Sequence, residues 1–302
     1  YTVDALKYLK NIDKSFYRID KRYASTPAMH SSLNDGMAQG YYGTSCYNSF
    51  NQKYYIQYLK AVGIISGTQE AETRWASGLT SRFILEGLNS VKYVLSKSPS
   101  DNVTRAFFDS VTTVGNVQIL KHKYALPLGY AFTSAYSLQD FNSCSANQKD
   151  FMSLRAAIIA DSNKNNASTI PFLAKQDTVN PAFVTFELLQ SFYDSLRAQS
   201  FQVSSFTPNH IEGNISLSKP SIVYFSIPYD KNWTIKDKNN KVQKCFLLTN
   251  GMMGIQLPAG EHALSLNYSI QSLGLGKKIS LAGLLLFGVL IFISFRFKKK
   301  DA

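Results

Sequence analysis

The chain has 302 residues, of which 45% are hydrophobic and 17% are charged, a composition typical of globular proteins and not of disordered ones. Its formal net charge of +12 favours anionic partners such as phospholipid or phosphate polymers. Six basic residues and one acidic residue flank an apolar run near the C-terminus, and without them 26 basic and 19 acidic residues remain. The sequence contains no helix-turn-helix pattern, zinc-finger spacing or other dense basic run, so nucleic acid is not expected as a partner.

Residues 1–198 predict a mixed α/β domain. Apolar residues recur with helical spacing in five segments: 2–14, 51–64, 78–88, 150–160 and 182–198. Short runs rich in β-branched and aromatic residues predict strands at 16–19, at 91–95 and, as two or three strands, within 107–124. Between them, 31–49 is rich in glycine, serine and asparagine and predicts a polar loop.

From Phe201 onward the pattern changes to alternation with a period of two. Five segments alternate in this way: 210–217, 221–227, 232–236, 244–249 and 261–269. Turn residues at 237–241 and 257–261 separate neighbouring segments. Several short strands at this spacing predict a small antiparallel β-sandwich over 199–274, so the fold class expected for the whole chain is α+β.

A run of 17 uncharged, mostly apolar residues at 279–295 lies close to the C-terminus. This length is near the lower limit for crossing a bilayer, and the basic flanks extend it by snorkelling, so a transmembrane helix is predicted at 277–297. Three lysines in 298–302 predict a cytoplasmic tail, which places 1–275 on the extracytoplasmic side of the cell membrane. Because no signal peptide begins the sequence, we expect a preceding part of a longer protein to carry it across.

The sequence lacks the common catalytic signatures. No Gly-x-Ser-x-Gly, Walker or His-Glu-x-x-His motif occurs, and the four histidines are scattered, so no catalytic residue, metal or cofactor is expected. Cys46, Cys144 and Cys245 are too few and too widely spaced for a disulfide framework. Two interpretations stay open for them: a Cys46–Cys144 pair, or three small buried hydrophobic side chains.

The break between the strands at 221–227 and 232–236 is a candidate ligand site. An aromatic face stacks on sugar C–H groups, and neighbouring carboxylate and amide groups bind hydroxyls. Alternatively, the tryptophan faces the sandwich core while the polar residues organise the turn. The candidate ligand residues are Tyr229, Asp230, Asn232 and Trp233, together with Asn48 and Ser49 of the polar loop.

Several short motifs follow one another along nearly the whole chain: Phe16-Tyr17-Arg18, Asn34-Asp35-Gly36-Met37, Gly43-Thr44-Ser45, Tyr47-Asn48-Ser49-Phe50-Asn51 with Tyr55, 87–95, 124–131, 227–234, 250–255 and 257–262. With the terminal apolar helix, they resemble the bacterial polytopic membrane proteins called YfhO. The resemblance implies a multi-span glycosyltransferase of the GT-C type that uses polyprenyl-phosphate sugars outside the cell, linked to glycosylation of teichoic acid or other envelope polymers.

The family's many membrane helices and its acidic catalytic loop have no counterpart in this sequence. The resemblance therefore implies the non-catalytic C-terminal extracytoplasmic domain and last transmembrane helix, with an acceptor-binding or structural role. Expected partners are the remainder of the same polytopic protein, membrane lipid, and an anionic cell-wall polymer or polyprenyl-phosphate sugar. The alternative is a single-pass cell-surface protein that binds carbohydrate or mediates adhesion.

Overall fold

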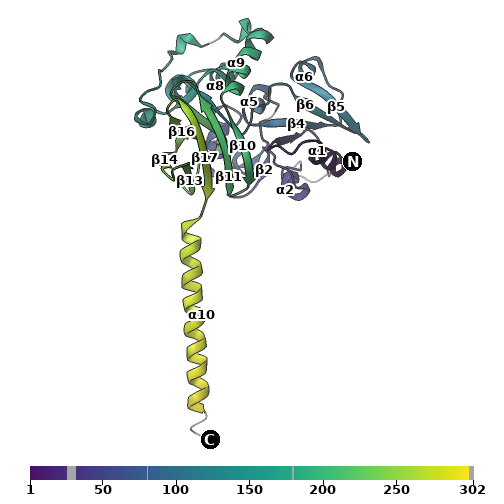
Figure 1. The fold of residues 1–302 in the computed structure, drawn as a ribbon. Coiled ribbons are helices and arrows are strands. Elements are labelled where there is room, and N and C mark those ends of the chain that lie inside the picture. The colour runs from purple at the N-terminus through teal and green to yellow at the C-terminus, as the bar shows by residue number, and fades with distance from the viewer. Residues whose placement is uncertain (26–31, 80, 179, 299–302) are drawn as a thin grey trace.

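The computed structural model describes residues 1–25, 32–79, 81–178 and 180–298. Figure 1 shows a mixed body of helices and sheets from which one long helix, α10 (Gln271–Lys298), projects away. The predicted α+β class is confirmed.

A small sheet forms the N-terminal part of the body. In the described residues it has four strands in the order β1-β4-β6-β5, with β1 parallel to β4 and the other pairs antiparallel. Helix α1 (Thr2–Ile12) covers it because Ala5, Leu6 and Leu9 pack on apolar side chains of these strands. The strands are β1 (Arg18–Lys21), β4 (Val91–Ser96), β5 (Phe108–Val114) and β6 (Val117–His122).

A larger sheet occupies the rest of the body. Its eleven described strands follow the order β14-β13-β17-β11-β10-β7-β12-β16-β15-β9-β8. They are β7 (Gly129–Phe132), β8 (Ala135–Ser137), β9 (Ala157–Ile159), β10 (Ser200–Thr207), β11 (His210–Leu217), β12 (Ser221–Pro228), β13 (Trp233–Asp237), β14 (Val242–Gln243), β15 (Phe246–Leu248), β16 (Met252–Leu257) and β17 (Gly260–Tyr268).

This sheet curls over its own core. Leu264 of β17 and Ile255 of β16 belong to one apolar cluster although their strands stand five places apart in the sheet. In a flat sheet that separation is about 24 Å, so the two halves must face each other. A register irregularity between Val203 and Ser205 of β10 lies where the halves meet.

Strands after residue 199 therefore face one another across a core, as in a sandwich, but they do not form a separate sheet. Strand β7 lies between β10 and β12 and hydrogen-bonds to both, and β8 and β9 extend the same sheet. The domain division after residue 198 stays a prediction. The end of the helix predicted at 150–160 is instead β9, whose three residues are all buried.

Helices pack on the other face of the sheet and form the largest core cluster with it. The predicted helices at 51–64, 78–88 and 182–198 are present but shorter. The remaining helices are α2 (Asp35–Gln39), α3 (Lys53–Ala61), α4 (Glu70–Arg74), α5 (Phe83–Leu88), α6 (Asn102–Phe107), α7 (Leu138–Asn142), α8 (Ala146–Arg155), α9 (Phe186–Ala198) and the 3-10 helices η1 (Asp161–Ala167), η2 (Lys175–Asp177) and η3 (Pro181–Phe183). Strands β2 (Cys46–Tyr47) and β3 (Trp75–Ala76) form a small ribbon.

Helix α10 contains the predicted membrane span. Its segment Ser272–Ile293 has 22 residues with a mean hydropathy of 1.9, and the body buries none of its most apolar part. By length and composition it is long and apolar enough to cross a bilayer. The orientation across the membrane stays a prediction, and four of the five residues of the predicted tail, 299–302, lie outside the described residues.

Candidate functional site

The corner between β12 and β13 is a hydrogen-bonded turn. Asp230 Oδ1 accepts a hydrogen bond from the Asn232 backbone N–H at 2.9 Å, and the Asp230 carbonyl accepts one from the Trp233 N–H at 3.1 Å. Tyr268 Oη donates to Asp230 Oδ2 at 3.2 Å. Trp233 is half-buried against the curled sheet's core, and its ring meets the Tyr268 ring at 5.2 Å. This geometry matches the turn interpretation, in which Asp230 organises the corner.

The other predicted residues lie in a loop that reaches the same corner. Asn48 Oδ1 accepts from the Phe50 N–H at 2.9 Å, while Ser49 is exposed. The two predicted groups are joined by residues that sequence reasoning missed. Gln52 Nε2 donates to the Tyr229 carbonyl at 2.7 Å, and the Tyr54 ring packs edge-on against the Tyr229 ring at 5.1 Å.

A cavity of about 280 Å³ opens beside this junction, and we call it the Arg18 cavity. None of the six predicted ligand residues lines it, although Pro228 and Gln52 next to them do. Its lining residues are Arg18, Gly43, Thr44, Ser45, Cys46, Asn51, Gln52, Tyr55, Leu79, Asn89, Ser226, Pro228 and Met252.

The charge in this cavity comes from Arg18, at the start of β1. Its Nη1 donates to the Asn89 carbonyl at 2.8 Å and to Ser226 Oγ at 3.0 Å, and its Nη2 donates to the Ser226 carbonyl at 2.6 Å. Among the described residues no carboxylate lies within ion-pair distance of it; Asp20, two residues further along β1, pairs with Arg22 at 3.0 Å. Burial lowers the pKa of the Arg18 guanidinium, yet arginine stays protonated in proteins. The cavity wall therefore carries an uncompensated positive charge.

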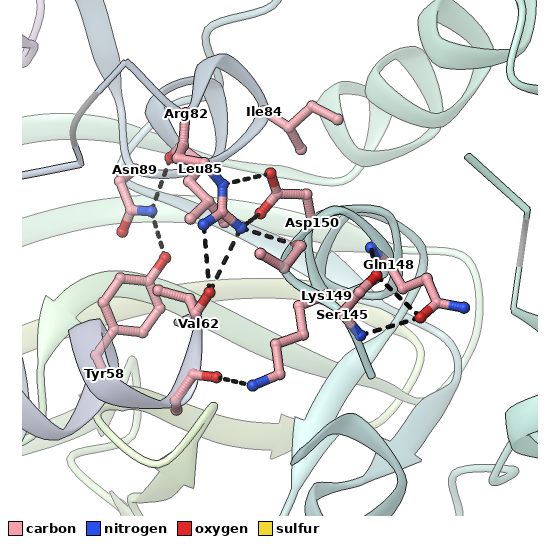
Figure 2. Close-up of polar contacts among 12 residues, drawn as sticks. Tyr58, Val62, Arg82, Ile84, Leu85, Asn89, Ser145, Gln148, Lys149 and Asp150 are labelled. Carbon is pink, nitrogen blue, oxygen red and sulfur yellow. Dashed lines mark hydrogen bonds and ion pairs between the residues drawn. The ribbon is translucent and has the colours of Figure 1, made fainter. Parts of the chain in front are cut away.

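Helix α3 supplies Tyr55 to the cavity, and Figure 2 shows how the C-terminal end of this helix is fixed. Arg82 pairs with Asp150 of α8 through two hydrogen bonds and also donates to the Val62 carbonyl just after α3. Lys149 Nζ donates to the Ala61 carbonyl at 2.9 Å. These bonds satisfy carbonyl groups that a helix end leaves without intrahelical partners.

Asn89 couples α3 to Arg18. Its Nδ2 donates to Tyr58 Oη of α3 at 2.7 Å (Figure 2). Its carbonyl accepts the bond from Arg18. At the other end of α3, Gln52 Oε1 accepts from the Tyr55 N–H at 2.6 Å and caps the helix. The helix and the guanidinium are therefore held in fixed relative positions.

The chemistry of the Arg18 cavity is set by Arg18, the one charged residue among the described residues of its lining. The described part of the chain contains no group of three or more His, Cys, Asp or Glu side chains placed to hold a metal ion. Cys46, Cys144 and Cys245 are free and half-buried, and burial raises the pKa of the Cys245 thiol to about 11. The Arg18 cavity instead presents a guanidinium, a group that pairs with oxyanions.

A sequence signal for this cavity existed in the motifs. Phe16-Tyr17-Arg18, Gly43-Thr44-Ser45 and Tyr47-Asn48-Ser49-Phe50-Asn51 with Tyr55 all contribute lining residues. The motifs around Pro228 and Met252 contribute as well. Their convergence on one cavity becomes visible only in three dimensions.

Comparison with known families gives a match along almost the whole chain. A family model described as bacterial membrane protein YfhO matches residues 2–170 and 159–280, which include the body and the start of α10. Comparisons with curated proteins and with solved structures gave no match. The chain belongs to the family of bacterial membrane proteins called YfhO.

Proposed function

We propose that this chain is the extracytoplasmic C-terminal portion of a polytopic membrane glycosyltransferase, and that it binds the phosphate of an anionic ligand in the Arg18 cavity. The ligand is an anionic cell-wall polymer of the teichoic acid class or a polyprenyl-phosphate sugar. The portion is itself non-catalytic and holds the ligand for transfer chemistry elsewhere in the same protein. Family membership and the apolar helix α10 support the membrane setting.

The observation that carries the proposal is the unneutralised guanidinium of Arg18. Three of its five N–H groups are engaged by Asn89 and Ser226. In the described part of the chain, the Nε–H and one Nη2–H have no partner, and these two form the parallel fork that matches two oxygens of a phosphate. An ion pair formed there offsets the cost of keeping a half-buried charge without a counter-ion.

The size of the cavity limits what it holds. Its volume of about 280 Å³ lies just below the usual range of small-molecule pockets, about 300 to 1,000 Å³. We therefore expect one phosphate with an adjoining sugar ring to enter, while the rest of a polymer or lipid stays outside.

Binding by the full chain in detergent tests this proposal. Purified teichoic acid and a short-chain polyprenyl-phosphate sugar are titrated against wild type, Arg18→Gln, Arg18→Lys and the control Arg105→Gln, which removes an equal charge at an exposed position. We expect Arg18→Gln to weaken binding about tenfold or more, because a charge-assisted bond contributes about 1.5 to 3 kcal/mol. Arg18→Lys should lose part of the affinity, because lysine keeps the charge without the fork.

The control Arg105→Gln should bind like wild type, and affinity should fall as salt rises. Thermal melting establishes that each variant is folded. Equal affinity of wild type and Arg18→Gln for both ligands would remove the phosphate-binding role. The transferase setting is tested separately by introducing Arg18→Gln into the complete polytopic protein, where sugar transfer should fall.

A further inference from the structure

The end of the body from which α10 leaves, which we call its base, lies very close to the bilayer that α10 is suited to cross. Strand β17 ends at Tyr268, and α10 begins at Gln271. The uncharged run starts at residue 279, eight residues into the helix, which corresponds to about 12 Å at 1.5 Å per residue. A headgroup layer is about 5 to 8 Å thick on each side. Side chains that project from this end of the body therefore come within reach of lipid headgroups.

The loop that contains β2 is tied to this end of the body. The Asn232 carbonyl accepts a hydrogen bond from the Ser269 N–H at 3.1 Å, so the corner adjoins the start of α10. Gln52 then connects the loop to the corner through the Tyr229 carbonyl. Figure 1 shows β2 and α2 on the side of the body from which α10 leaves.

Three large apolar side chains are exposed on α2, on the loop after β2 and on β3. Phe50 is 91% exposed, Met37 85% and Trp75 41%, and we call them the basal patch. They are held on fixed backbone, because Asn34 next to α2 exchanges two hydrogen bonds with the Tyr47 backbone, at 2.8 and 3.0 Å. Tyr47 pairs in turn with Trp75 across the β2–β3 ribbon.

Two exposed lysines accompany the basal patch, although Glu70 and Glu72 of α4 lie just before Trp75 in the chain. Lys53 is the first residue of α3, three residues after Phe50, and Lys231 is an exposed residue of the corner. None of the ion pairs among the described residues includes either lysine. Aromatic side chains beside lysines are typical of segments that settle at the membrane–water interface, where rings enter the headgroup layer and cations meet anionic lipid.

We propose that the basal patch inserts into the headgroup layer of the membrane that α10 spans. The short connection between β17 and α10 favours lipid as the occupant, because it holds the patch at that depth. Insertion seats the body against the membrane surface and places the loop that lines the Arg18 cavity next to the lipid. The inference stands on the patch alone and does not depend on which ligand enters the cavity.

The two tryptophans of the chain make a direct test possible. In Trp233→Phe, the remaining tryptophan is Trp75 of the basal patch, and excitation at the red edge of the tryptophan band avoids the tyrosines. The full chain is reconstituted into phosphatidylglycerol–phosphatidylcholine vesicles whose acyl chains carry bromine close to the headgroup. A matched control places one tryptophan by Phe183→Trp in a Trp75→Phe, Trp233→Phe background; Phe183 is 77% exposed and closely precedes α9, at the end of the body opposite α10.

We expect brominated lipid to quench Trp75 about twofold or more relative to unbrominated lipid, and to leave the control tryptophan unchanged. Adding Met37→Ser and Phe50→Ser should reduce the quenching of Trp75, and circular dichroism monitors folding. Quenching by brominated lipid is also compared between wild type and Met37→Ser, Phe50→Ser, both of which keep the two natural tryptophans, and it should again fall in the variant. The proposal is overturned if aqueous iodide quenches Trp75 and brominated lipid does not, or if neither quencher reaches Trp75.

Discussion

Gln52 joins two segments that lie 177 residues apart, because its side-chain Nε2 donates to the carbonyl of Tyr229 at 2.7 Å. The same side chain caps α3 through its Oε1, which accepts from the Tyr55 N–H. One residue therefore fixes both the start of the helix that lines the Arg18 cavity and the corner, which is hydrogen-bonded to Ser269 just before α10.

Gln52→Leu should destabilise the protein by about 1 to 2 kcal/mol, because it removes a helix cap and leaves the Tyr229 carbonyl without this donor. Urea unfolding of the chain in detergent measures the change. Gln52→Glu separates the two roles, since a carboxylate still caps α3 but cannot donate to the carbonyl. If Gln52→Leu and Gln52→Glu are both as stable as wild type, the contacts of Gln52 with Tyr229 and with the start of α3 do not contribute to stability.

The Arg82–Asp150 pair should be among the most sensitive polar contacts in the body. Both side chains are largely buried, and desolvation raises the pKa of Asp150 although the Arg82 guanidinium opposes the rise. Asp150→Ala leaves a buried cation without its partner, which costs about 3 to 5 kcal/mol. The exposed pair between Lys164 and Asp161 is the control, and Asp161→Ala should cost about 0 to 1 kcal/mol. Equal unfolding midpoints for the two variants would contradict this ranking.

The sequence predicted the elements that carry a strong local pattern. The expected strand 210–217 coincides with β11, because its alternation places every second residue in the core. The helix predicted at 150–160 ended too late, because the apolar residues of β9 also suit a buried helix and only pairing with β8 decides between them. Local pattern therefore identified most elements but not their partners in the sheet.

The Arg18 cavity could not be assembled from local pattern. Arg18 and Ser226 are 208 residues apart in the chain, and their contact depends on how two sheets meet. The sequence located the polar corner and Asn48 nearby, because turn residues are recognisable locally. It missed Arg18, since a single arginine in a strand has the pattern of an ordinary surface cation until the absence of a nearby carboxylate is seen.

His122 should weaken the protein in acid. It is buried, its Nε2 lies 2.9 Å from the Phe83 carbonyl, and its Nδ1 accepts from the Tyr124 N–H at 3.0 Å, so both ring nitrogens are engaged by the neutral form. Desolvation, with the Arg22 charge nearby, lowers the pKa of His122 to about 4 from 6.5. Its contribution to stability is complete above pH 6.5 and is lost as pH falls toward 4, because only the unfolded chain binds the proton.

His122→Gln isolates this effect. The difference in unfolding free energy between wild type and His122→Gln should shrink by about 2 to 3 kcal/mol between pH 7 and pH 4.5. Other titrating groups contribute to both proteins and largely cancel in this difference. A difference that stays constant over this range would mean that His122 titrates normally in the folded protein.

Gly251 is the position where a single methyl group should disturb the Arg18 cavity from outside. A Cβ at Gly251 would overlap the Tyr54 carbonyl oxygen and the Tyr58 side chain, and would lie 2.8 Å from the Tyr58 backbone nitrogen. Backbone cannot rotate away as a flexible side chain can, so Gly251→Ala must push α3 outward. We expect a loss of about 1 to 3 kcal/mol in unfolding free energy from this overpacking.

The same displacement should weaken phosphate-ligand binding, because α3 carries Tyr55 into the cavity and its start is fixed by Gln52. Gly63→Ala is a matched control in the turn after α3, where a Cβ would meet no atom within 4 Å, although its φ of +77° adds local strain. Gly63→Ala should therefore lose stability without losing affinity, whereas Gly251→Ala should lose both. Unchanged affinity in folded Gly251→Ala would show that the position of α3 does not control binding.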